Sequence, residues 1–456
     1  MFNRLKLFVN SKFFIEFLFT AFLIFFPFGA SLIKLSIGFM TIYPSLIILF
    51  LLFFFGLFHL NKIKFKIEKY ALSLLIVWII YAFVQYLYLI DKAYALMDIR
   101  SLLVFLLYLY VFIWTRTYLG LSRLFEIINF LFKIIYALIF LFAVFEVFTG
   151  IHFIGHFTDK VGHGPITLAL YSPVFLWDNP NNLVVFFLLA SSIILLTEKK
   201  TKNIFSLILI ILSTNLFIAY TAQARIGEFA IFVFAFSLFP YIFFMLKRNK
   251  ILKKKLAIIT MVILLFAVHF IALPKYYGPI WSKQKDNLGT LKTTNEHSGI
   301  YELDAGTPND SIIKKYDSKK IRISLILNGL ELFRTSNYLG VGPGQFKLFH
   351  KDRQVQYYTK TNIGPHNWTI EIISQYGVFI FIAYLILFGW IILIVIKNFR
   401  QNIYKSTLIL FSIILFFLLS NLPSSFINHP INWLFTSILI LVTTSLQQVN
   451  TESIDE

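Results

Sequence analysis

Long apolar runs separated by polar connectors repeat through most of the chain. A helix needs about 20 apolar residues to cross the hydrocarbon core of a bilayer, and these runs are close to that length. The pattern predicts an all-α polytopic membrane protein. The first run is too long, and too closely followed by the second, for a cleaved signal peptide, so we expect a span there. About twelve spans are predicted, at residues 13–29, 38–60, 70–90, 100–118, 127–149, 180–196, 204–220, 226–246, 256–273, 377–396, 406–421 and 431–447.

Basic residues gather in alternate connectors, after the even-numbered spans, and are sparse in the others. Short loops rich in Lys and Arg stay in the cytoplasm. We therefore predict a protein of the cytoplasmic membrane with both termini inside. The basic residues concerned are Lys62, Lys64, Lys66, Lys69, Arg116, Arg123, Lys199, Lys200, Lys202, Lys247, Arg248, Lys250, Lys253, Lys254, Lys255, Lys397, Arg400 and Lys405, with Arg4, Lys6 and Lys12 at the N-terminus.

One connector, between the ninth and tenth spans, has the length of a small domain. It divides the chain into residues 1–273 with nine spans, an extracytoplasmic loop at 274–366, and residues 367–456 with three spans. Loops of this length are usually functional or disordered. We expect the first part of this loop, residues 283–320, to be mobile, and short helices after it.

Periodicity predicts a helix over residues 318–333 of this loop. Ser324, Asn328 and Glu331 recur at spacings of four and three, which places them on one polar face. Arg322 falls on the apolar side, where a buried charge needs a partner. The charge on this helix is therefore a candidate functional group.

Composition agrees with a bilayer as the main solvent. The chain is 58% hydrophobic and only 14% charged, which is far from a soluble globular mixture. The formal net charge of +19 is spread over connectors, so it indicates topology, and no nucleic-acid partner is predicted. The chain has no Cys, which excludes disulfides, thiolate metal sites and a cysteine nucleophile.

His366 stands where the loop returns to the membrane, in the segment 364–368. A helix is predicted to begin at Pro365 or His366, capped by Asn367 or a neighbour. The positive end of a helix dipole disfavours an imidazolium, so we expect a neutral ring that can act as a general base. The alternative is an interfacial histidine packed on Trp368.

Two arginines lie at predicted outer ends of spans. Arg225 lies between the seventh and eighth spans, where the positive-inside rule disfavours a cation. Its planar fork suits a phosphate or diphosphate, and the alternative is snorkelling to lipid headgroups. Arg100 invites the same interpretation, but an ion pair with Asp98 is the simpler account.

Other charged patterns have simple explanations. Ionisable residues inside predicted spans are costly and often functional, and they could line the polar track of a transporter, but most lie near span ends. The close carboxylates Glu302 and Asp304 are interpreted as solvated, so no metal site is predicted. The residues inside predicted spans are Glu16, Lys133, Glu146, Glu228 and His269.

Several segments together resemble a known family. The sequence GVGPGQF at 340–346, PHNWTIEIISQYG at 365–377 and KIRISLILNGLELF at 320–333 are similar to motifs of the O-antigen ligase and polymerase family. The likeness is greatest to its Gram-positive branch, which includes teichuronic acid and capsule polymerases. DNPNNL at 178–183 and TAQARIGEF at 221–229 resemble further family motifs.

The resemblance implies a membrane glycosyltransferase of the C superfamily. Such enzymes use no nucleotide sugar, metal or other cofactor, and transfer a glycan from undecaprenyl diphosphate to an acceptor glycan or lipid outside the membrane. By motif, His366 corresponds to the essential histidine, and Arg225 and Arg322 to the arginines that bind the diphosphate. Arg100, Asn367 and Asn181 are secondary candidates. Gln223-Ala224 stands where many relatives have small hydroxyl residues.

The expected activity is an inverting, metal-independent transfer that polymerises surface polysaccharide. A ligase that joins the glycan to a lipid, wall polymer or protein is the alternative within this class. A twelve-helix transporter or flippase is the alternative from another class, but the two halves show no matching pair of broken helices.

Overall fold

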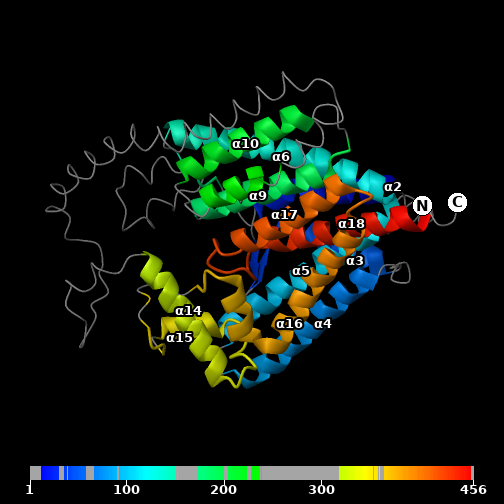
Figure 1. The fold of residues 1–456 in the computed structure, drawn as a ribbon. Helices are drawn as coiled ribbons and strands as arrows, with labels where there is room; N and C mark the ends of the chain where they lie inside the picture. Colours follow the sequence, from blue (N-terminus) through cyan, green and yellow to red (C-terminus); the bar gives the residue numbers. More distant parts are fainter. Residues whose placement is uncertain are drawn as a thin grey trace, which may run out of the picture.

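The computed structural model describes residues 12–29, 35–37, 40–57, 66–89, 92–149, 151, 173–175, 177, 179–199, 204–222, 227–236, 238, 318–352, 354–357, 359 and 364–452. Within these ranges the chain is helical apart from connecting turns and one small antiparallel hairpin (Figure 1). The labelled elements are α2 (Lys12–Phe25), η1 (Phe26–Phe28), β1 (Leu35–Ile37), β2 (Met40–Ile42), α3 (Pro44–Leu57), α4 (Lys66–Tyr88), α5 (Ala93–Leu119), α6 (Leu121–Thr149), α9 (Pro180–Thr197), α10 (Ile204–Thr221), α14 (Ser318–Thr335), α15 (Gln345–Lys351), α16 (Trp368–Lys397), α17 (Ile403–Leu419) and α18 (Pro430–Glu452).

Every predicted apolar run contains a helix, except 256–273, which lies outside the described residues. Six described helices are long and apolar enough to cross a membrane. Helices are expected there because lipid offers backbone groups no hydrogen bonds, so each segment must satisfy its own. The chain is thus a multi-pass membrane protein, while the count of twelve spans stays a prediction. The six are α4, α5, α6, α9, α16 and residues 430–447 of α18.

The second predicted span was drawn too long. Residues 38–60 were expected to form one helix, but Met40–Ile42 pairs with Leu35–Ile37 as a strand, and α3 begins only at Pro44. Proline lacks a backbone N–H and is tolerated in the first turn of a helix. The apolar pattern continues across this boundary, so hydropathy alone could not place it.

The centre of the bundle is formed by α9 and α18. About nine tenths of the residues in the apolar window of α18 are buried, and α9 is nearly as enclosed, whereas fewer than half of the window residues of α4 and α16 are buried. Small hydroxyl residues let neighbouring helices approach α18 closely. Its buried Ser and Thr residues are Thr436, Ser437, Thr443, Thr444 and Ser445.

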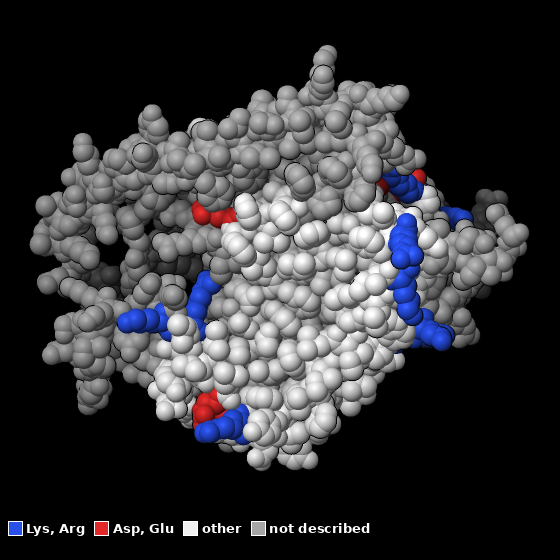
Figure 2. All heavy atoms as spheres, in the orientation of Figure 1, with Lys and Arg blue, Asp and Glu red and all other residues white. Residues whose placement is uncertain are grey.

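The bundle has two distinct ends. We call the end that carries α14 and α15 the α14 side, and the end where α18 finishes the opposite side (Figure 1). Figure 2 shows a broad face without charged side chains between basic groups at the two margins. Such an uncharged band is the surface expected of a chain that lies in hydrocarbon.

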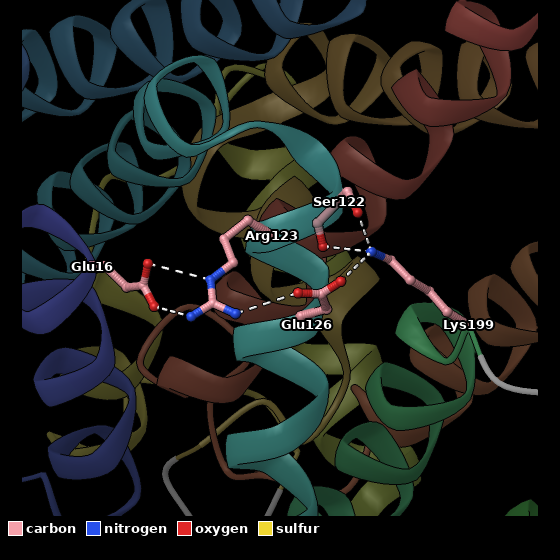
Figure 3. Close-up of polar contacts among 5 residues, drawn as sticks. All are labelled: Glu16, Ser122, Arg123, Glu126 and Lys199. Atoms are coloured by element: carbon pink, nitrogen blue, oxygen red, sulfur yellow. Dashed lines mark hydrogen bonds and ion pairs between the residues drawn. The ribbon is translucent and has the colours of Figure 1, made fainter. Parts of the chain in front are cut away.

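Polar contacts confirm that the basic connectors meet on the opposite side. Figure 3 shows Arg123 at the start of α6 bonded to Glu16 of α2, with Glu126 next to it and Lys199 after α9. Lys199 Nζ donates to Glu126 at 3.0 Å and to the Ser122 carbonyl at 2.7 Å. These groups border a cleft of about 700 Å³. The basic connectors before α6 and after α9 therefore lie at the same end of the bundle, as their charge predicted.

The predicted loop helix exists as α14, but one polar assignment was wrong. Ile321, Leu325, Gly329 and Leu332 form its buried stripe, and Asn328 lies on the same stripe at 1% exposure. The side chain of Asn328 is buried because it bonds to both backbone groups of a loop residue, as described below. The helix was predicted correctly, but Asn328 does not lie on its polar face. A hydrogen-bonded asparagine can occupy a buried position.

Candidate active site

The glycine-rich turn after α14 docks onto a break in α16. Gly377 has φ +76° and ψ −176°, which interrupts the helix. Val341 N–H donates to the Ser374 carbonyl at 2.8 Å, and Gly342 N–H donates to the Gln375 carbonyl at 2.9 Å. The turn therefore satisfies carbonyls at the break that would be costly to bury unpaired. The segments GVGPGQF and PHNWTIEIISQYG, noted in the sequence, form one structural unit.

Glycine is required at this contact by space as well as by backbone angle. A Cβ on Gly377 would lie 2.5 Å from the Leu339 carbonyl oxygen, and one on Gly340 would lie 2.5 Å from the Gln375 oxygen. Gln85 of α4 covers the junction, because its Nε2 donates to Gln375 at 3.2 Å and to Gly340 at 3.3 Å. Three segments distant in sequence are locked together here.

The end of the same turn rests on the start of α5. A Cβ on Gly344, which has φ +70°, would lie 2.3 Å from the Tyr94 carbonyl carbon. Gly344 N–H donates to Asp98 Oδ2 at 2.9 Å. Asp98 is 1% exposed and also accepts from Asn428 Nδ2 at 2.6 Å. This carboxylate ties α5 to the glycine turn and to the segment before α18.

The expected ion pair between Arg100 and Asp98 is not formed. The carboxylate of Asp98 is instead bonded by Gly344, Asn428 and, at 3.5 Å, by the Tyr376 hydroxyl. Residues two apart on a helix do not share a face. Arg100 is half-buried, and its charge opposes the rise that burial causes in the pKa of Tyr43.

His366 lies just before α16, in a strained backbone conformation. Its φ is +47°, which is uncommon for a residue with a side chain. The helix was expected to begin at Pro365 or His366, but it begins at Trp368, with Asn367 as its N-cap. Asn367 Oδ1 accepts the Ile370 N–H at 3.0 Å. Asn367 therefore has the predicted capping role, and His366 is placed outside the helix.

The ring of His366 has a lowered pKa and one nitrogen without a described partner. Burial lowers the pKa of the His366 imidazole, the positive charge of Arg322 lowers it further, and a hydrogen bond to the backbone of Leu422 opposes both. Nδ1 is buried and has no hydrogen-bond partner among the described residues.

Arg322 projects from α14 and is half-buried. No carboxylate in the described part of the chain lies within ion-pair distance of Arg322. Its charge nevertheless acts on His366, since it lowers the pKa of that ring. A guanidinium that is partly desolvated and without an anion is a natural site for an anionic ligand.

Asn328 and His350 brace α14 against the loop that follows. Asn328 Nδ2 donates to the Tyr357 carbonyl at 2.8 Å, and Asn328 Oδ1 accepts the Tyr357 N–H at 2.8 Å. His350 contacts Asn328 at 3.1 Å and the Phe346 carbonyl at 2.8 Å. Burial lowers the pKa of the His350 imidazole, and its bonds indicate a structural role.

The other sequence candidates are placed as follows. Arg225 lies outside the described residues, as do His269, Glu302 and Asp304. Asn181 lies in the first turn of α9, where its N–H donates to the N-cap Asn179 at 2.8 Å. No hydrogen bond or ion pair within the described ranges joins Asn181 to His366. Nor does any described group of three or more His, Asp or Glu side chains form a metal-binding cluster.

Ionisable residues inside predicted spans are satisfied locally. Glu16 pairs with Arg123, and Lys133 pairs with Glu198. Glu146 is fully buried and accepts N–H groups from Val174 and Phe175, each at 2.7 Å. Glu228 is half-buried near the start of its helix. The simpler account of Glu16, Lys133 and Glu146 is therefore confirmed.

Comparison with known proteins agrees with this geometry. Residues 207–385 match the sequence profile of a family described as O-antigen ligase. This part of the chain is similar to the O-antigen ligase family. The matched segment extends from α10 into α16, so it includes α14, the glycine turn and His366.

A curated relative is similar over a larger part of the chain. It is the teichuronic acid biosynthesis protein TuaE of Bacillus subtilis, 25% identical over 334 residues. The match covers 69% of this chain and 61% of the length of TuaE. The similarity to a teichuronic acid protein supports the Gram-positive branch expected from the motifs.

Sequence reasoning missed three polar residues of the α14 side. Glu371, Ser425 and Asn428 are joined in one network of hydrogen bonds with Asp98. Glu371 is one carboxylate in an apolar helix, at 1% exposure. That isolation was the available signal, because a carboxylate is buried only when it is bonded.

Proposed function

We propose that the protein transfers an oligosaccharide from a polyprenyl diphosphate to an acceptor hydroxyl, at the outer face of the cytoplasmic membrane. The supporting observation is His366, an imidazole with a lowered pKa and an unpaired Nδ1, within electrostatic reach of Arg322, which has no described ion pair. The match to the O-antigen ligase family, which covers both residues, supports the same class of reaction. The donor is expected to be undecaprenyl-linked.

The reaction is a single displacement. The acceptor hydroxyl donates its proton to the imidazole of His366, and its oxygen forms a bond to the anomeric carbon of the donor sugar. The bond from that carbon to the diphosphate oxygen breaks, and the lipid diphosphate leaves with the electron pair. One displacement inverts the configuration at the anomeric carbon. General-base help of this kind contributes about 10²–10⁴-fold.

Arg322 has its role at the leaving group. Negative charge grows on the diphosphate as the sugar bond breaks, and a preorganised cation stabilises that charge in the transition state. Arg225 is proposed to contribute a second guanidinium by its motif. The same charge adds to burial in lowering the pKa of His366, so this arginine acts on both the base and the leaving group.

The acceptor is proposed to be the end of another lipid-linked glycan, which makes the protein a polymerase. The similarity to a teichuronic acid biosynthesis protein supports this choice. The family description supports the ligase alternative. Glycan analysis of a deletion strain separates them, because single repeats left on the carrier lipid indicate polymerisation, and complete chains left there indicate ligation.

A transporter receives no support from the described spans. A carrier places unpaired polar groups along a path near the membrane midplane, whereas Glu16, Lys133 and Glu146 are bonded locally. Proteoliposomes loaded with lipid-linked glycan test the proposal. We expect the donor to be consumed and a longer or acceptor-linked glycan to form; translocation of unchanged glycan would contradict it.

A further inference from the structure

Two buried carboxylates of the α14 side lie outside the reaction described above. Asp98 of α5 and Glu371 of α16 are each 1% exposed. A buried carboxylate is retained only where hydrogen bonds replace its hydration. The described partners of these two residues show which parts of the chain they hold.

Glu371 holds the segment that joins α17 to α18. Ser425 Oγ donates to Glu371 Oε1, and Phe426 N–H donates to Glu371 Oε2 at 2.5 Å. Both oxygens of the carboxylate therefore bind one short stretch of backbone and side chain. A buried donor that loses its acceptor is costly, so these two bonds hold the segment in place.

The same segment contacts His366 and the residues before it. His366 N–H faces the Ser424 carbonyl at 3.4 Å, and the ring is bonded to the backbone of Leu422. A Cβ on Gly364 would lie 2.5 Å from the Ser424 carbonyl oxygen. The peptide groups at Leu422 and Ser424 thus form the surface on which His366 rests.

Asp98 holds the other end of this segment. Asn428 Nδ2 donates to Asp98 Oδ1 at 2.6 Å, and Ser101 Oγ donates to Asn428 Oδ1 at 2.6 Å. Asn428 Nδ2 also donates to Ser425 Oγ at 3.0 Å. The network therefore runs from the glycine turn, through Asp98 and Asn428, to Glu371.

We propose that Glu371 is a positioning residue for His366, acting through the Leu422–Phe426 backbone, with Asp98 and Asn428 bracing that backbone from α5. His366 has a strained φ of +47°, and such a conformation persists only where its surroundings enforce it. Glu371 fixes those surroundings without touching the reacting groups. The catalytic part of this inference depends on the proposed transferase function, but the positioning part does not.

The ring orientation can be measured without any substrate. The full-length protein in lipid nanodiscs is treated with diethyl pyrocarbonate, which acylates neutral imidazoles, and mass spectrometry follows each histidine separately. We expect Glu371→Gln to raise the rate at His366 by about tenfold, because the amide offers one acceptor oxygen where the carboxyl group offers two, and one of the two hydrogen bonds to the segment is lost. His350 is an internal reference, and its rate stays unchanged if α14 and α15 remain folded.

Glu146→Gln is the matched control. Glu146 is also a buried carboxylate that accepts two backbone N–H groups, from Val174 and Phe175. We expect this variant to leave the rate at His366 as in the parent protein. An unchanged His366 rate in Glu371→Gln, or an equal rise in Glu146→Gln, overturns the positioning role. If Glu371→Gln does not fold, Ser425→Ala removes one contact of the same carboxylate and tests the same expectation.

Kinetics provide the second readout. With lipid-linked glycan extracted from a deletion strain as donor, Glu371→Gln is expected to lower kcat by about 10²-fold while KM changes little, since a small displacement of a catalytic group has this effect. A rise in KM with unchanged kcat contradicts this. If the parent protein transfers no glycan while the difference in acylation persists, the proposed function fails and the positioning role stands.

Discussion

The two ends of the bundle use the same charged residue types in different ways. On the opposite side, Arg116 is bonded to Glu68 in the interior, and Arg123 is bonded to Glu16 and Glu126 at the surface. On the α14 side, Arg322 has no described carboxylate partner. Nδ1 of His366 has no described hydrogen-bond partner.

This difference distinguishes charges that stabilise the fold from charges that can act on a ligand. A charge already paired within the protein interacts weakly with a ligand, whereas an unpaired charge can stabilise the opposite charge on one. Pairing on the opposite side stabilises the helix ends, whereas on the α14 side His366 and Arg322, which lack described partners for Nδ1 and for the guanidinium charge, are open to the proposed substrate. The comparison leads to four predictions.

His366→Ala is expected to have the largest effect. Removal of the base should lower transfer by roughly 10²–10⁴-fold, with insertion unchanged, because Asn367 still caps α16. Donor consumption in proteoliposomes measures the rate. Full activity in this variant removes the base from the scheme.

Arg322→Gln is expected to lower the rate by about 10²-fold, and Arg322→Lys by less, since a lysine keeps the charge but not the fork. The variant also has a pH signature. Arg322 lowers the pKa of His366, so its removal raises that pKa. Activity needs the neutral ring. As the pH is lowered, the variant should therefore lose activity at a higher pH than the parent protein does.

Arg334→Gln is the matched control on the same helix. Arg334 is mostly exposed and bonds only Glu331, three residues away. We expect neither the rate nor the acid limb of its pH profile to change. A shift of the acid limb in this control as large as in Arg322→Gln would mean that general surface charge is responsible.

Arg116→Ala is expected to change stability and leave the chemistry intact. Its partner Glu68 is fully buried, and an unpaired buried charge costs about 3–5 kcal/mol. Thermal unfolding in detergent measures the loss, and the rate per folded molecule should equal that of the parent. Lost catalysis in fully folded protein would place Arg116 in the reaction.

Arg123→Ala should have the smallest effect. Its side chain is half exposed in a surface network, and exposed ion pairs contribute little and weaken with salt. The unfolding temperature should fall slightly at low ionic strength and match the parent at high ionic strength. A large loss that persists in salt would show that the cleft bordered by these residues requires the network drawn in Figure 3.

The apolar runs predicted most helices, because each one must satisfy its own backbone in lipid. They failed at the hairpin before Pro44, since apolar strands and apolar helices look alike over a few residues. The site was predicted only in part. The candidates His366, Arg322 and Asn367, the N-cap of α16, could be found by motif. The hydrogen-bond partners of Asp98, Glu371 and Asn428 lie far away in sequence, and no local pattern predicts such contacts.

The break at Gly377 also limits how this chain can be recombined. The glycine turn and α16 exchange backbone hydrogen bonds there. Each segment therefore needs the other to satisfy its backbone groups. A chimera that takes the loop of one relative and the following helix of another would have to keep the close backbone contacts that Gly340 and Gly377 allow. Grafting is therefore expected to succeed when residues 318–397 are moved as a block.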